Sequence, residues 1–91
     1  MVWQRNLPLV RQRLQALRSA ADQSQLAPLS APVRLEATEI AHKLAGSLGM
    51  FGYLEGSDIS KHLETLLDSE EPLSGARFGD LMAQLEQHLA L

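Results

Sequence analysis

Apolar residues recur along most of this chain at intervals of three and four, and this helical period limits the fold more than any other feature does. The first segment shows the period in Trp3, Leu7, Val10, Leu14 and Leu17. Steps of three and four residues place side chains on one face of an α-helix, whereas a half-buried strand alternates every second residue. The period is interrupted around residues 23–32, 49–52 and 70–72. We therefore predict four amphipathic helices.

Capping and breaking residues set the predicted bounds of these helices, approximately 7–22, 32–49, 53–69 and 74–90. A mid-helix proline costs ~3 kcal/mol, so we expect Pro8 in the first turn, behind an N-cap near Asn6. Residues 2–5 then form a short lead-in or a kinked extension. Pro32 fits the first turn of the second helix, and Ser74 is the predicted N-cap of the last. Short connections between four helices predict an all-α, antiparallel, up-down-up-down four-helix bundle, formed by residues 1–91 as a single domain.

The composition fits a small globular domain and excludes several functions. The chain has 91 residues, of which 45% are hydrophobic, and this is enough for one core. A net charge of -3 and scattered cations argue against nucleic-acid binding, which needs a basic stripe. The chain has no cysteine, which fits a reducing compartment, and no stretch approaches ~18 apolar residues. We expect a cytoplasmic, monomeric domain that does not enter a membrane.

The second predicted helix carries an exposed histidine. Its apolar residues fall within one arc of about 100°, and His42 lies roughly 150° from the middle of that arc. The arc contains Val33, Ala37, Ile40, Ala41, Leu44 and Leu48. The opposite face, around His42, contains Leu35, Thr38, Glu39, Ala45, Gly46 and Gly49. His42 is therefore predicted to point into solvent.

Small residues around His42 favour a function for its imidazole. A mid-helix glycine costs about 0.5–1 kcal/mol relative to alanine, so two of them need a compensating reason. We expect Ala45, Gly46 and Gly49 to leave the ring clear for a partner's active site, with Leu35 as an apolar contact. A neutral imidazole is a good nucleophile near pH 7. Thr38 or Glu39 is expected to hold one ring nitrogen, and the sequence leaves open which nitrogen attacks.

The segment Ala41–Gly52 resembles the signature of histidine phosphotransfer (HPt) domains, usually written H-x-L-K-G-S and followed a few residues later by a glycine. The matching positions are His42, Leu44, Gly46, Ser47 and Gly52. The similarity extends over residues 33–68 and is strongest to HPt domains attached to multidomain, cyanobacterial-type response regulators. The resemblance implies that His42 is phosphorylated and exchanges the group with receiver domains and a sensor histidine kinase. It implies a carrier with no ATP-binding motif, not an autokinase.

The resemblance also bears on the residues near His42. The family often has a lysine three positions after the histidine, where this chain has Ala45, and its lysine is instead Lys43. Glu64 lies where the family often places Gln or Glu, on the third helix and facing the phosphohistidine, with Lys61 one turn earlier. The resemblance implies no cofactor for this domain, because the receiver partner supplies the Mg²⁺.

Other interpretations fit the sequence less well. Glu39-x-x-His42 resembles half of a di-metal bundle motif, but such sites need two copies that face inward. His62 and His88 lack a partner at zinc-ligand spacing and are expected in solvent. A kinase dimerisation domain usually has an acidic residue after its histidine, where Lys43 stands. A passive helical interaction module, with His42 as an ordinary surface residue, is the alternative from another functional class.

Overall fold

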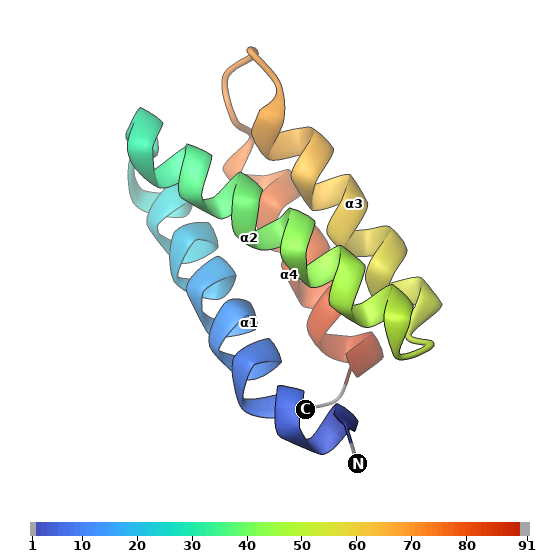
Figure 1. The fold of residues 1–91 in the computed structure, drawn as a ribbon. Coiled ribbons are helices and arrows are strands. Elements are labelled where there is room, and N and C mark those ends of the chain that lie inside the picture. The colour runs from blue at the N-terminus through green and yellow to red at the C-terminus, as the bar shows by residue number, and fades with distance from the viewer. Residues whose placement is uncertain (1, 90–91) are drawn as a thin grey trace.

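The computed structural model describes residues 2–89, although not the side chains of residues 2–4 and 6, so the predicted contribution of Trp3 to the core lies outside the description. Four helices make up the described chain, and no strand occurs in it. They are α1 (Val2–Leu26), α2 (Ala31–Met50), α3 (Leu54–Asp68) and α4 (Gly75–Leu89). Consecutive helices run in opposite directions (Figure 1). The predicted all-α, up-down-up-down bundle is confirmed.

The first helix is longer at both ends than the predicted 7–22. It begins before Pro8, which lies inside it, so the predicted N-cap at Asn6 is wrong. Pro8 is exposed, and its missing N–H removes one helical hydrogen bond from this end of the helix. At the other end, the helix continues beyond residue 22 to Leu26, and the Ser24 hydroxyl donates to the carbonyl of Ala21 at 2.6 Å. The predicted connection 23–32 shrinks to residues 27–30.

The remaining boundaries lie within one residue of their predicted positions wherever the chain is described. Ser30 caps α2 by accepting from the Val33 amide, and Pro32 lies in the first turn as predicted. The turn between α2 and α3 contains Gly52, whose φ of +85° favours glycine. Ser74 accepts from the amide of Arg77, which confirms it as the cap of α4.

The helices pack in sequence order around one core. Among the described residues, α2 contacts α1 and α3, and α4 contacts the same two helices. The largest fully buried side chains come from all four helices, and they include Leu17, Leu44, Leu48, Leu63, Phe78 and Leu85. Gly56 lies inside this packing, because a Cβ there would be 3.1 Å from Leu89 and 3.2 Å from Leu48. Glycine at this position therefore lets α3 approach α2 and α4 closely.

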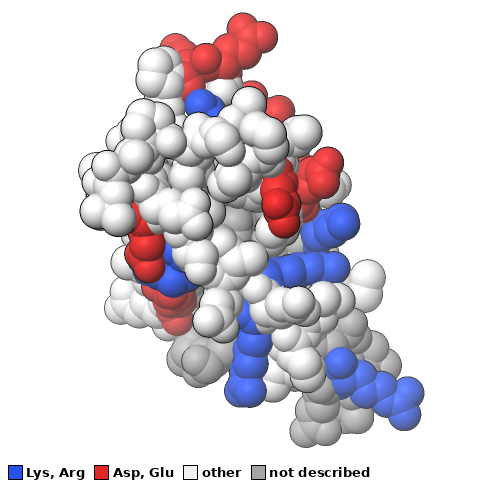
Figure 2. Space-filling model, turned by 90° about the vertical axis from the view of Figure 1, so that its left-hand side faces the viewer, with Lys and Arg blue, Asp and Glu red and all other residues white. Residues whose placement is uncertain are grey.

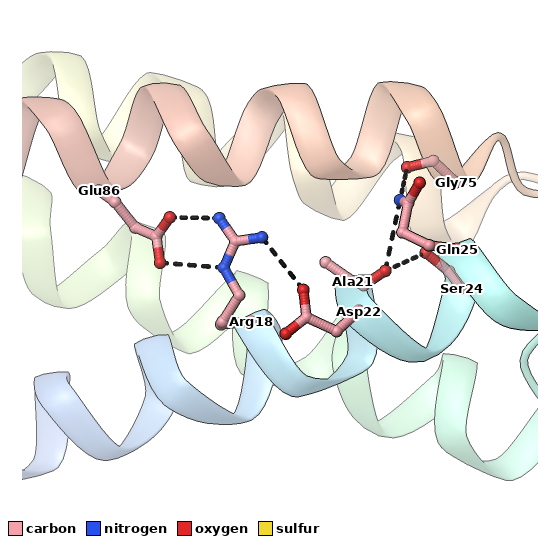
Figure 3. A network of polar contacts seen from close by, with 7 residues as sticks. All are labelled: Arg18, Ala21, Asp22, Ser24, Gln25, Gly75 and Glu86. Atoms are coloured by element: carbon pink, nitrogen blue, oxygen red, sulfur yellow. Dashed lines mark hydrogen bonds and ion pairs between the residues drawn. The ribbon is translucent and has the colours of Figure 1, made fainter.

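Polar contacts join α1 to α4 and complete the ring of helices (Figure 3). The guanidinium of Arg18 donates to both carboxylate oxygens of Glu86 and to Asp22, at 3.1 Å for Nε and Glu86 Oε2. The hydrogen bond to Glu86 raises the pKa of Arg18 above its usual value. Farther along, the Gln25 amide donates to the carbonyl of Gly75 at 2.5 Å. A Cβ on Gly75 would lie 2.6 Å from the carbonyl oxygen of Ser24, so this crossing requires glycine.

Arg34 connects the start of α2 to the end of α3. Its guanidinium donates to the carbonyls of Leu67 at 2.7 Å, Ser69 at 2.6 Å and Leu66 at 3.3 Å. The last carbonyls of a helix have no intrahelical partner and carry partial negative charge, which a cation satisfies. Arg34 therefore caps α3 and fixes its position along α2.

Candidate functional site

His42 projects from the exposed side of α2. Its neighbours Ala41 and Leu44 are fully buried, and this orientation of the helix turns the imidazole outward. The His42 side chain is 72% exposed. The structure therefore places His42 where the sequence predicted it, on a surface that a second protein can reach.

Glu64 of α3 holds the imidazole of His42. Its Oε2 lies 2.9 Å from His42 Nδ1, and its side chain is 32% exposed. Burial of Leu63 and Leu67 on α3 turns the intervening Glu64 toward α2. An ionised carboxylate only accepts hydrogen bonds, so Nδ1 carries the proton and Nε2 of the neutral ring keeps its lone pair. The contact thus orients the ring and selects its tautomer.

Two residues expected beside the ring do not hold it. The Thr38 hydroxyl donates to the carbonyl of Arg34 at 2.9 Å, one turn back along α2. Glu39 is exposed and makes no hydrogen bond or ion pair with His42 in the described part of the chain. The expectation that Thr38 or Glu39 fixes a ring nitrogen is therefore wrong, because the carboxylate from the neighbouring helix occupies Nδ1.

A shallow hollow of about 560 Å³ lies beside His42, between α2 and α3. His42 and Glu64 line it together with Ala45, Gly46, Gly49, Met50, Ser57 and Lys61. Gly46 is exposed, and a Cβ there would meet nothing within 4 Å. Its surface is open as expected, so a side chain added at this position would extend toward whatever approaches the ring.

Ala45 and Gly49 contribute to helix packing as well as to surface clearance. Ala45 is only 5% exposed, and its carbonyl accepts from the buried Ser57 hydroxyl at 2.8 Å. A Cβ on Gly49 would lie 3.2 Å from the same hydroxyl oxygen. Both residues line the hollow beside His42, in agreement with the prediction that small residues leave the ring clear. They also let α3 approach α2 closely, and that approach brings Glu64 to His42.

Three further residues complete the surroundings of the site. Leu35 is 61% exposed, and Met50, which sequence reasoning did not select, is 79% exposed at the edge of the hollow. Both offer apolar surface to a partner. Lys43 is exposed but does not line the hollow.

Two contacts that sequence reasoning missed join α2 to its neighbouring helices near the site. Arg13 of α1 donates to the hydroxyl of Ser47 at 3.1 Å, and so joins α1 to the α2 turn that follows His42. The other contact is that of Ser57 with α2. A serine within the buried stripe of α3 is the sequence signal that could have revealed it, because buried hydroxyls need a partner.

One basic residue of α1 contacts the helix that carries His42. Figure 2 shows Lys and Arg side chains on the lower half of the face in view, below most of the acidic ones. Arg13 contacts Ser47 of α2, whereas Arg11 lines a groove between α1 and α4. A protein that approaches α2 from the α1 side therefore meets positive charge next to the turn that contains Ser47.

Residues 2–89 offer neither a metal site nor a membrane-spanning helix. No group of three or more His, Cys, Asp or Glu side chains there could hold a metal ion. None of the four helices is both long enough and apolar enough to cross a bilayer.

The fold and the site define an all-α bundle that presents one oriented histidine on an exposed helix face. The family model of the Hpt domain matches residues 2–90, nearly the whole chain. The protein therefore belongs to the Hpt domain family, whose members carry phosphoryl groups on a histidine in phosphorelays. No curated protein and no solved structure matches the chain.

Proposed function

We propose that His42 is the phosphoryl-carrying residue of this domain and that its Nε2 is the nucleophile. The hydrogen bond between Nδ1 and Glu64 carries the proposal, because it leaves Nε2 unprotonated on a ring that is 72% exposed. A nucleophile needs a free lone pair and access to the donor, and this nitrogen has both.

Transfer begins when a receiver domain places its aspartyl phosphate over the ring. The lone pair of Nε2 forms a bond to phosphorus while the bond from phosphorus to the aspartyl oxygen breaks in line, and its electron pair leaves with the carboxylate. The proton on Nδ1 stays in place, so the phosphorylated ring becomes cationic. The Glu64 carboxylate stabilises this developing charge as well as the ring orientation, as an acidic residue does for other catalytic histidines.

The partner supplies the rest of the chemistry. The receiver contributes the Mg²⁺, a lysine and the acceptor aspartate, and this domain contributes no cofactor of its own. The open surface over Gly46 admits the receiver's active site, and Leu35 and Met50 give it apolar contact. A second receiver removes the phosphoryl group by the reverse reaction. A sensor histidine kinase supplies phosphoryl groups to the relay. We place the domain in the cytoplasm, as a monomer that binds these proteins and neither nucleic acid nor membrane.

Incubation with a phosphorylated receiver tests this function. Wild-type protein should gain an acid-labile, base-stable label, and His42→Gln should gain none. His62→Gln is the matched control, because His62 is also exposed but lies outside the hollow, and it should label normally. Label that persists in His42→Gln would refute the assignment. Absence of label in every variant would favour the passive interaction module.

A further inference from the structure

Charge is unevenly distributed in the hollow beside His42. The transferred phosphoryl group is anionic, and the hollow that receives it already contains the Glu64 carboxylate, 2.9 Å from the ring. Like charges brought together on a surface repel. The α2 wall offers nothing to offset this repulsion, since Ala45, Gly46 and Gly49 are uncharged and Lys43 does not line the hollow.

Lys61 is the cation that faces this hollow. It lies on α3 one turn before Glu64, is exposed, and helps to line the same hollow as His42. The described residues provide its ammonium with no hydrogen bond or ion pair. The ammonium is therefore available to an incoming anion, and its flexible four-carbon stem lets it follow that anion.

We infer that Lys61 binds the phosphoryl group at His42 and offsets the charge of Glu64, so that α3 supplies both polar groups of the site. This role rests on the proposed function of His42. Glu64 acts on Nδ1 and on the ring cation, whereas Lys61 acts on the phosphoryl oxygens at Nε2. Neither group is on the helix that carries the nucleophile, so the packing of α3 against α2 determines both.

Phosphoramidate, a small anionic phosphoryl donor, tests this role without any protein partner. In this reaction Nε2 forms a bond to phosphorus, the bond from phosphorus to the donor nitrogen breaks, and ammonia leaves. Exposed ion pairs contribute about 0.2–1 kcal/mol. Lys61→Gln should accordingly label at His42 roughly 1.4- to fivefold more slowly at low salt, since 1.4 kcal/mol is a factor of ten. The rate, measured by intact-protein mass spectrometry, should also lose part of its dependence on salt.

Two variants separate this role from general effects of charge. Lys61→Arg keeps the cation and should label at close to the wild-type rate. Arg77→Gln removes the same charge from exposed α4, a helix that does not contact α2, and should behave as wild type. All variants should have the same Tm as the wild type, because both substituted positions are exposed.

The outcomes distinguish the two proposals. If His42 labels but Lys61→Gln shows the wild-type rate and salt dependence, the role of Lys61 is wrong and the carrier function stands. An equal loss of rate in Arg77→Gln would likewise overturn the role, because net charge would then explain the effect. If the wild type does not label at His42, the carrier function fails and the role of Lys61 fails with it.

Discussion

Gly46 gives the sharpest prediction, because its replacement should separate stability from transfer. A Cβ at this exposed position meets no atom within 4 Å, so Gly46→Ala introduces no clash. Replacing a mid-helix glycine by alanine gains about 0.5–1 kcal/mol. A domain of this size changes its Tm by roughly 4–8 °C per kcal/mol, so we expect Gly46→Ala to melt roughly 2–8 °C higher than the wild type.

The rate of phosphoryl transfer should fall when Gly46 is replaced, although stability rises. The longer side chain in Gly46→Arg fills the open surface over which the receiver must approach, and misplacement of reacting groups by about 1 Å can cost 10²-fold in rate. We expect this variant to fold, to melt at or above the wild-type temperature, and to accept label from a phosphorylated receiver roughly tenfold or more slowly. Rapid-quench transfer assays and thermal denaturation monitored by circular dichroism measure the two effects on the same samples.

Gly49→Ala is the matched control for this prediction. A Cβ there would lie 3.2 Å from the Ser57 hydroxyl, so the neighbouring helix must shift slightly and the gain in stability should shrink or reverse. If a folded Gly46→Arg protein transfers at the wild-type rate, the receiver does not approach over Gly46 and the docking argument is wrong. A lower Tm in Gly46→Ala would contradict the open-space argument.

Two further predictions concern the contacts of α3. Glu64→Ala should slow transfer to His42 by about fivefold, the effect of losing a charge-assisted hydrogen bond discounted for its exposure, with Glu64→Gln intermediate. Nitrogen NMR shifts of the His42 ring should show that the preference for a proton on Nδ1 is lost, and an unchanged tautomer and rate would contradict the role of Glu64. Arg34→Ala should lower the free energy of unfolding by about 1–3 kcal/mol in urea denaturation, because it leaves carbonyls at the end of α3 without their partner. Arg34→Lys should recover only part of this loss, and a cost below about 0.5 kcal/mol would show that water caps α3 equally well.

The helices, their assembly into a bundle and the exposure of His42 could be predicted from the sequence, because the spacing of residues along each helix determines which face is apolar. The spacing of Ala41 and Leu44 alone is enough to turn His42 outward. The start of α1 was predicted wrongly for a related reason. The local penalty of Pro8 favours a helix that begins at this residue, whereas the chain is already helical from Val2.

The family resemblance placed Glu64 facing His42, and the structure agrees. The helical pattern by itself did not identify this partner of the imidazole, because the contact depends on how two helices are aligned. Thr38 and Glu39 are the nearest candidates within α2, and local geometry favoured them. The observed partner, Glu64, is 22 residues away in the sequence. The position of Glu64 beside His42 depends on the contact of Gly49 with Ser57 and on the cap that Arg34 provides. No pattern within a single helix reveals these contacts.

The turn at Gly52 has a consequence for insertions and deletions in this chain. His42 lies 10 residues before Gly52 and Glu64 lies 12 residues after it (52 − 42 and 64 − 52). Because these two separations are similar, the side chains of His42 and Glu64 lie at the same height along the helix pair when the chain turns at Gly52. One residue inserted into either arm would rotate its functional side chain by about 100° and shift it by 1.5 Å along the axis. Length changes should therefore be tolerated better in residues 27–29 and 70–73, which lie between the capping residues, than between His42 and Glu64.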